Sequence, residues 1–536
     1  MTGPGVVGWS ATLSDTRARA AIYARRYGVP PTMIEAAARR RSVGDWRGAC
    51  AAADVDLFFD FDSVRRRHGS AMAESLLADL RALSPDLLRW HLPRRGHGPG
   101  QLLDGLLIPL AQYAEYDGAG TTLTLAAATP GFAVDAGQRI VLAVLEGSAG
   151  RGRTNTYTTP AVRALLQAVH PRSVEHYDLR RHRMFWDAAH APRLRELCSI
   201  GTEDAEEILR VQDEGCAVAA WNAAGFQVTV GAPPSAGTVT AEERQRLARW
   251  LATVPVSLPR LADQVRDALP GTGQAVIRCG GGAIILSGLE SEGRRPRATI
   301  VQPRTARDLR ASAPTVPDAA WARPIDVDLL RLGLLEAHEL HPLVASALTQ
   351  DTDEPAESGE WRYSTTLGIE DQYTGTTGSD KQPVVLVRCG ADLHRVVRSE
   401  GRWQTIDHDD HALRETLLAR LGGLTNNCRA AAQHLGSGRH VIELVARLLE
   451  HGRVTEATRL LRDHADTVTA PEDYTLPDGG TVGQALDALR ENTLRLRMTR
   501  AGAPPVHDSR STRVAPPNVS IRRSRKGESA RPKIPR

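Results

Sequence analysis

Lysine is nearly missing from this sequence and aromatic side chains are few. The 536-residue chain has three lysines against 64 arginines, and Phe, Trp and Tyr together make up 4%. The arginine excess indicates GC-rich coding DNA and carries no functional weight. No apolar run approaches the ~18 residues that span a bilayer. The N-terminus has no basic start followed by an apolar stretch, so we predict a cytoplasmic protein with no membrane partner.

Cysteine motifs and nucleotide-binding signatures are missing as well. The six cysteines form no CxxC pair and no short Cys/His cluster, which argues against a zinc finger and predicts reduced, mostly buried thiols. The patterns GxxxxGK[ST] and GxSxG do not occur; Gly3–Gly8 matches GxGxxG, a pattern that is weak by itself. We therefore predict no cofactor.

What the chain does contain is strand-like groups separated by helical groups. Runs such as Leu106–Tyr116 and Thr121–Ala127 are β-like, and helical patterns precede and follow them. This order predicts an α+β fold, with several small antiparallel β-meanders alternating with helical segments. The expected divisions are a helical region 1–95, α+β regions 96–235 and 236–350, a meander with helical hairpins 351–500, and a tail 501–536.

Helical hairpins are expected near both ends. The segments Glu35–Ala49 and Glu443–Ala457 share the pattern A-R-x4-G-x4-A, in which small residues and a glycine turn are typical of tetratricopeptide-like helix pairs. One pair at each end is not a solenoid, since stacked repeats need about three copies. Two ordinary helical hairpins are the alternative.

Two stretches of the chain share a sequence pattern, which predicts a repeated structural unit. Residues 276–301 and 386–406 each contain an apolar run ending in Arg-Cys-Gly and then Ser-Glu-Gly-Arg. Each predicts three antiparallel strands joined by two tight turns. Alternation along a strand places the cysteine on the core face, and Arg278 and Arg388 on the opposite face. The two arginines are solvated charges or, alternatively, a paired anion-binding site.

One short motif suggests an enzyme. Asp60-Phe61-Asp62-Ser63-Val64 follows the run Val55–Phe59 and resembles the first motif of haloacid dehalogenase-like phosphohydrolases. In that family the first aspartate is the nucleophile and the second an acid/base, at the end of a buried parallel strand. The resemblance implies a phosphohydrolase centred on Asp60 and Asp62.

The same segment departs from that family's pattern. Asp54 and Asp56 interrupt what should be a continuous apolar strand, and Lys381 is the only lysine before the tail. The other interpretation is an exposed edge strand with outward acids, followed by a helix cap at Asp62 or Ser63.

The densest cluster of metal-ligand side chains is the stretch from Asp407 to His411. Asp407, His408 and His411 are the candidate ligands there. The stretch lies where a strand is expected to lead into a helix, so an N-cap at Asp409 or Asp410 is the alternative. We predict no metal site on balance.

The C-terminal tail is strongly basic. Nine of residues 509–536 are Arg or Lys and only Glu528 is acidic, whereas the whole chain has a net charge of +4. Prolines are frequent and aromatics are missing, so we expect disorder. The run Arg522, Arg523, Arg525 and Lys526 could neutralise phosphates without reading sequence.

Three functional hypotheses follow. The first is a non-enzymatic interaction or scaffold protein with an unidentified protein partner. The second is nucleic-acid association through residues 509–536, and the same tail could instead dock on the acidic remainder of the chain. The third is the phosphohydrolase centred on Asp60 and Asp62.

Overall fold

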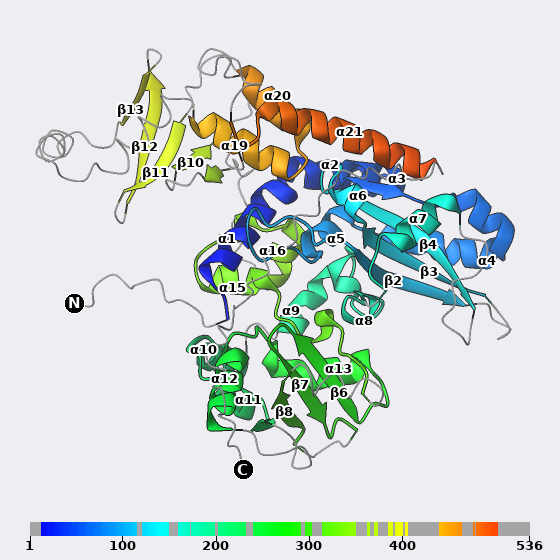
Figure 1. Cartoon of the computed structure of the whole chain (residues 1–536), viewed down its shortest axis with the longest axis vertical. Helices are drawn as coiled ribbons and strands as arrows, with labels where there is room; N and C mark the ends of the chain where they lie inside the picture. The colour runs from blue at the N-terminus through cyan, green and yellow to red at the C-terminus, as the bar shows by residue number, and fades with distance from the viewer. Residues whose placement is uncertain are drawn as a thin grey trace, which may run out of the picture.

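The computed structural model describes most of the chain between residues 12 and 501 (Figure 1). The described residues are 12–114, 121–148, 159–171, 173–198, 202–231, 240–290, 295–302, 313–349, 362–364, 369–372, 384–389, 392–399, 402–405, 439–463, 475–476 and 479–501. For the strands between 362 and 405 only the backbone is described, apart from three side chains. Within these residues no helix has the length and apolar content needed to cross a membrane.

The first module, residues 31–148, is a four-stranded sheet with helices before and between its strands. Its elements are α2 (Pro31–Ser42), α3 (Trp46–Ala52), β1 (Val55–Leu57), α4 (Phe61–Ala82), α5 (Pro85–His91), β2 (Leu106–Ala114), β3 (Thr121–Thr129), α6 (Gly131–Val134) and β4 (Ile140–Ser148). The strand order is β1-β4-β3-β2, with β1 parallel to β4 and the other pairs antiparallel.

Both faces of this sheet are buried, which explains why the central stretches of its inner strands, residues 125–128 and 140–145, are entirely apolar. Leu125 and Leu142 point into the main core, which also holds residues of α4 and α5. Ala126 and Val141 point to the other face, where α7 (Pro160–Gln167) and Leu496 of the last helix cover them. The alternation of faces along each strand separates the two sets.

The second module, residues 203–301, has the same plan. Its elements are α10 (Glu203–Asp213), α11 (Ala217–Ala223), β5 (Gln227–Val230), α12 (Ala241–Ala252), α13 (Leu261–Ala268), β6 (Gln274–Cys279), β7 (Gly282–Ser287) and β8 (Arg297–Val301). The strand order is β5-β8-β7-β6, with β5 parallel to β8 and the rest antiparallel. Each module thus runs helical hairpin, parallel edge strand, two helices and then a three-stranded meander.

The turns of the helical hairpins also have the same geometry in the two modules. Gly44 and Gly215 follow the first helix of the two hairpins, with φ of +74° and +83°. In both, the glycine N–H donates to the carbonyl three residues back and the next N–H to the carbonyl five back. This is a Schellman motif, which needs a left-handed residue. Ten residues after each glycine, Asp54 and Gly225 again have positive φ, immediately before the edge strand region.

After each module a tryptophan directly follows a one-turn 3₁₀ helix, Trp186 after Arg183–Phe185 and Trp321 after Asp318–Ala320. The carbonyl oxygen of Trp186 accepts from the backbone N–H of Ser84 at 2.8 Å, and that of Trp321 accepts from Ser257 at 2.8 Å. Ser84 lies directly before α5, and Ser257 directly before the 3₁₀ turn Leu258–Arg260 that leads into α13. The correspondence therefore extends beyond the sheet and its hairpin.

Short helices lie before, between and after the two modules. Before the first module lies α1 (Asp15–Tyr23), which Ser14 caps and which continues as a π-helical turn, Ala24–Gly28. The remaining connecting helices are α8 (Ser173–His176), α9 (Leu194–Cys198), α15 (Ile325–Arg331) and α16 (Pro342–Leu348). The main core includes residues of α1, the first module, α9, α15 and α16.

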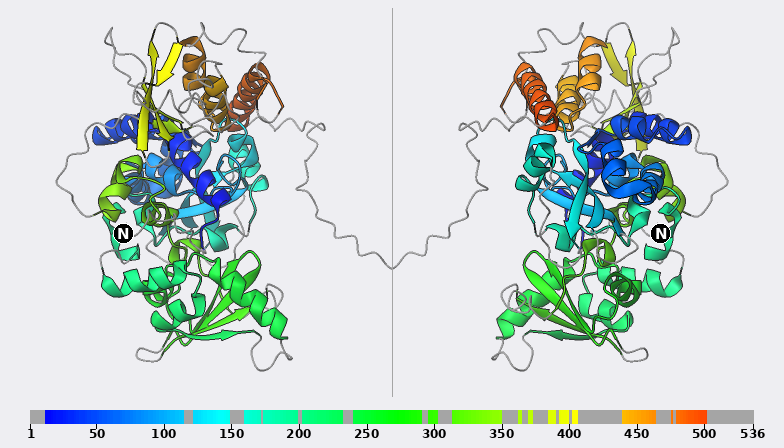
Figure 2. Two further views of the ribbon diagram at one scale, coloured as in Figure 1. Left: turned by 90° about the vertical axis from the view of Figure 1, so that its left-hand side faces the viewer. Right: turned by 90° about the vertical axis from the view of Figure 1, so that its right-hand side faces the viewer.

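The C-terminal part contains a third sheet and three helices. The sheet has the order β13-β12-β11-β10-β9 and is antiparallel throughout; its strands are β9 (Arg362–Ser364), β10 (Ile369–Gln372), β11 (Val384–Cys389), β12 (Asp392–Ser399) and β13 (Arg402–Thr405). The helices are α19 (Arg439–Glu450), α20 (Val454–Asp463) and α21 (Val482–Arg500). These three helices lie on the first module, away from the second (Figures 1 and 2).

The α+β class and the helical hairpins near both ends are confirmed. The expected divisions at 95 and 235 fall inside structural units, because β1 and β5 pair with strands that come after those positions. The edge strands join their sheets through parallel pairing across long stretches of sequence. Residues 502–536 lie outside the described residues.

The two predicted meanders are both antiparallel, but they differ in construction. The first turn is a two-residue connection in each, after Cys279 and after Cys389. The second turn was expected to be tight in both. In the first meander this is wrong: β7 ends at Ser287 and β8 begins at Arg297. The strand that extends each meander also lies on a different side. In the first sheet β5 pairs with β8, the last strand of its meander, whereas in the other sheet β10 pairs with β11, the first strand of its meander. The sheet that shares the plan of β5–β8 is β1–β4.

Candidate binding sites

The first candidate site is where the C-terminal hairpin α19–α20 meets the first module. Gly452 forms the hairpin turn with φ +74°, and it repeats the two Schellman hydrogen bonds of the module hairpins. A Cβ built on Gly452 would lie 2.3 Å from the Cα of Gly137, so the two backbones are in direct contact. Glycine at both positions permits this approach.

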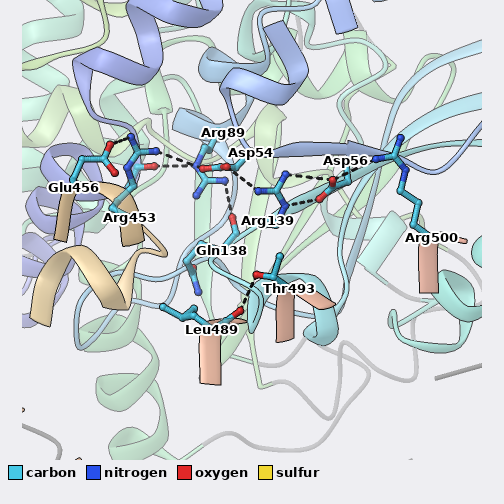
Figure 3. A network of polar contacts seen from close by, with 11 residues as sticks. Asp54, Asp56, Arg89, Gln138, Arg139, Arg453, Glu456, Leu489, Thr493 and Arg500 are labelled. Atoms are coloured by element: carbon cyan, nitrogen blue, oxygen red, sulfur yellow. Dashed lines mark hydrogen bonds and ion pairs between the residues drawn. The ribbon is translucent and has the colours of Figure 1, made fainter. Parts of the chain in front are cut away.

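An ion network surrounds that contact (Figure 3). The Arg139 guanidinium bridges Asp54 at 2.9 Å and Asp56 at 2.6 Å, both from the start of the edge strand. Burial alone would lower the pKa of Arg139, but hydrogen bonds and the charges of Asp56 and Asp54 outweigh it and raise the pKa. From the C-terminal helices, Arg453 reaches Asp54 at 3.5 Å and Arg500 reaches Asp56 at 3.9 Å.

Buried side chains pack next to the contact between Gly137 and Gly452. Arg89 is fully buried and donates to the carbonyl oxygens of Gly28 at 2.9 Å and Gln138 at 2.6 Å. Burial lowers its pKa to about 10, which still leaves it charged at neutral pH. His451, next to the hairpin glycine, is fully buried and stacks on Tyr27. Burial, and then the charges of Arg94 and Arg89, lower the pKa of His451 well below its ordinary value.

Among the described residues, no helical hairpin covers the corresponding edge of the second module. Gly225 and Gln227 take the places of Asp54 and Asp56, because the hairpin glycines and the positive-φ residues align. The side chains of Gln227 and Thr229 on β5 are exposed. A Cβ on Gly225 would have nothing within 4 Å.

The second candidate site is a cavity of about 350 Å³, which we call the inter-module cavity. Its walls come from α1 and the π-helical turn, the end of α5 with the following loop, β2, and residues 318–326 after the second module. Five arginines and two aspartates line it, together with His91: Arg17, Arg25, Arg94, Arg95, Arg323, Asp318 and Asp326. This volume lies in the lower range of small-molecule sites.

A buried ion pair forms one wall of the inter-module cavity. Arg25 binds both carboxylate oxygens of Asp326, at 2.8 and 3.0 Å, and Trp90 Nε1 donates to the same carboxylate at 3.2 Å. The guanidinium also lies over the Trp90 ring, 4.7 Å from its centroid. Burial would raise the pKa of Asp326, but the Arg25 charge and hydrogen bond outweigh it and lower the pKa.

His91 faces the cavity as a neutral imidazole. Burial is the main cause that lowers its pKa to about 3, and the nearby Arg25 adds to the effect while Asp326 opposes it. The ring packs edge-on against Phe185 with centroids 4.9 Å apart, and its buried Nε2 has no hydrogen-bond partner among the residues that the structure describes.

Asp60 and Asp62, the suggested phosphohydrolase residues, lie at the start of α4. Asp60 is the N-cap, and its carboxylate accepts from the backbone N–H groups of Asp62 at 3.3 Å and Ser63 at 3.0 Å. Its side chain is 62% exposed. The preceding strand β1 is at the edge of its sheet. The cap was expected at Asp62 or Ser63 and lies at Asp60 instead.

The predicted anion pair is only half described. Arg278 is on the face opposite Ile277, as the alternation predicts, and its Nε donates to Thr315 Oγ1 at 3.1 Å. Cys279 packs against the same core as Ile277. The side chain of Arg388 lies outside the described residues. So do the candidate metal ligands Asp407, His408 and His411, and the tail residues Arg522, Arg523, Arg525 and Lys526.

Both candidate sites were missed by the sequence analysis. The signal for the first was present, since Gly452 and Gly44 occupy the same place in a shared pattern. Nothing local connects Gly137 to Gly452, or Arg25 to Asp326. No family model matches the chain, and no curated protein or solved structure shows significant similarity to it.

Proposed function

We propose that this chain is a protein-interaction or scaffold protein whose duplicated module binds helical hairpins. One observation carries the proposal. The first module holds the α19–α20 hairpin of its own chain at the end of its edge strand, through the contact of Gly452 with Gly137 and the ion network around Asp54. The second module has the same strand plan and an exposed edge strand. We expect that edge to receive a glycine-turn hairpin from a protein partner.

The buried thiols are not in the form that acts as a nucleophile. Burial raises the pKa of Cys50 to about 12, with a smaller contribution from the charge of Asp45. Burial likewise raises the pKa of Cys198 to about 12. Both thiols are therefore protonated at neutral pH, whereas thiolates are the nucleophilic form. Within the described ranges, no group of three or more His, Cys, Asp or Glu is arranged to hold a metal ion.

Site-specific photo-crosslinking tests the proposal on the full chain. A benzophenone amino acid at Gln227 on β5 should capture a partner in cells, and sequencing of the crosslinked peptide should show a helix–glycine–helix segment. The control position is Arg246, an exposed residue on α12 of the same module. Equal labelling from both positions, or peptides without such a hairpin, would refute the proposal.

Nucleic-acid association is a second candidate, favoured by the charge segregation of the sequence. Nine basic residues lie in 509–536, while the rest of the chain is net negative. Each phosphate contact releases about one counterion, so binding should weaken steeply with salt. Deleting residues 509–536 should abolish binding to a random DNA duplex and its salt dependence. Unchanged affinity and slope would exclude this candidate.

A further inference from the structure

We propose that the inter-module cavity binds a small organic anion that carries an apolar group, such as an aryl or alkyl carboxylate or phosphate ester. The inference is independent of hairpin binding. It rests on the volume of about 350 Å³, on the surplus of arginine over aspartate in the walls, and on the apolar residues between them. A cavity of this size encloses a molecule of roughly ten to twenty heavy atoms.

Not every arginine in the cavity wall is paired with a carboxylate of the described residues. Arg25 is saturated by Asp326, and Arg323 pairs with Asp213 and Asp328. Arg17, in contrast, is half-buried in the wall, and no hydrogen bond or ion pair joins its side chain to another described residue. A guanidinium in this position is suited to a carboxylate or phosphate.

Arg94 adds positive charge without a carboxylate partner among the described residues. It donates to the carbonyl oxygens of Gly100 at 3.3 Å and Arg89 at 3.0 Å, and its buried Nε has no hydrogen-bond partner within the described part of the chain. Burial, and then repulsion from Arg25 and Arg89, lower its pKa well below the ordinary value. An anion in the cavity would offset this repulsion.

The apolar side of the cavity selects against a bare inorganic ion. Trp90, Ile108, Leu179, Phe185 and Ile325 all line it. These walls gain free energy by covering an apolar group, and they cannot replace the hydration of a small hydrophilic anion. The preferred ligand therefore has one charged end and one apolar end.

The placement of the walls gives such a ligand a structural effect. Arg17 belongs to α1 and His91 to the first module, whereas Asp318 and Ile325 follow the second module. A ligand that contacts both sides stabilises the junction between the modules. A ligand that binds only the folded state raises the thermal midpoint as its concentration passes Kd.

Calorimetric titration of the full chain with phenyl phosphate tests the inference. We expect saturable binding with one site per chain, at least tenfold weaker binding of inorganic phosphate, and none of benzyl alcohol. Arg17→Gln should weaken phenyl phosphate binding about tenfold or more. Arg19→Gln, an exposed arginine two residues further along α1, is the matched control and should leave Kd unchanged.

A second variant fills the cavity rather than removing its charge. Ala319→Leu places a larger side chain on the wall and should abolish binding while circular dichroism and the thermal midpoint without ligand stay unchanged. The inference is overturned if phenyl phosphate does not bind saturably. It is also overturned if Arg17→Gln and Arg19→Gln behave alike, or if a folded Ala319→Leu variant binds normally.

Discussion

Gly137 and Gly452 touch through their backbones, although they are far apart in the sequence. Gly137 lies between α6 and β4 of the first module, and Gly452 forms the turn of the C-terminal hairpin. Both have positive φ, at +99° and +74°. The contact therefore depends twice on glycine, once for the backbone conformation and once for the space a Cβ would occupy.

We expect Gly452→Ala to destabilise the docked hairpin. The alanine must adopt a left-handed conformation, which costs about 1–2 kcal/mol, and its Cβ meets the Gly137 backbone. Steric overlap of this kind costs roughly a further 1–3 kcal/mol. Limited proteolysis should show faster cleavage between residues 439 and 463, and urea unfolding a lower midpoint.

Gly44→Ala is the matched control for that change. Gly44 has the same φ of +74° in the same Schellman turn, but a Cβ there would have nothing within 4 Å. It should cost only the conformational part, about 1–2 kcal/mol. Equal losses for the two variants would show that the contact with Gly137 contributes nothing.

The buried pair of Arg25 and Asp326 should be sensitive to removal of one partner. Both side chains are nearly inaccessible, at 6% and 0%. Asp326→Ala leaves a buried, uncompensated guanidinium, and we expect a loss of about 3–5 kcal/mol in the free energy of unfolding. The double variant Arg25→Met, Asp326→Leu removes both charges and should recover most of this loss. Urea unfolding of the unmodified chain, the single variant and the double variant measures the loss and the recovery. A double variant that is no more stable than Asp326→Ala would contradict the argument.

The ion pair of Asp54 and Arg453 should contribute less, because both side chains keep some contact with solvent. Asp54→Asn preserves the positive φ of +56°, which asparagine tolerates, and removes the charge. We expect a loss of about 0.5–1 kcal/mol. Arg453→Gln should cost about the same, and the double variant should cost less than the sum. Strict additivity in the double-mutant cycle would show that the two side chains do not interact.

All three helical hairpins share a sequence pattern, but only two of them were predicted from it. The spacing R-x4-G-x4-A of the two predicted hairpins occurs a third time around Gly215, with Arg210 before the glycine and Ala220 after it. The final alanines of all three, Ala49, Ala220 and Ala457, are fully buried. The middle copy was missed because the alanine before the arginine is replaced by Leu209. Packing needs only the small residue after the turn, so the pattern was defined one position too strictly.

The sheets could be predicted only in part. The meander strands follow from alternating apolar residues and glycine turns, which are local signals. The parallel pairing of Val55 with Ile140 has no local signal, because β1 is three residues long and carries Asp56 in its middle. Arg139 offsets that charge, and only the folded chain brings it there. For the same reason, the cavity around Arg25 and Asp326 could not be read from either segment alone.

Two buried histidines should make stability fall in mild acid. Burial lowers the pKa of His182 to about 4, and burial followed by nearby arginines lowers that of His451 well below its ordinary value. In the unfolded chain both take up a proton near pH 6.5, while the folded chain does not, so the unfolded state binds more protons as the pH falls. Each should therefore reduce the free energy of unfolding by about 1.4 kcal/mol between pH 7.5 and 5.5. Urea unfolding at the two pH values measures the loss. His182→Gln should remove its share, and His97→Gln, at an exposed position, should not; a slope unchanged by His182→Gln would contradict the assignment.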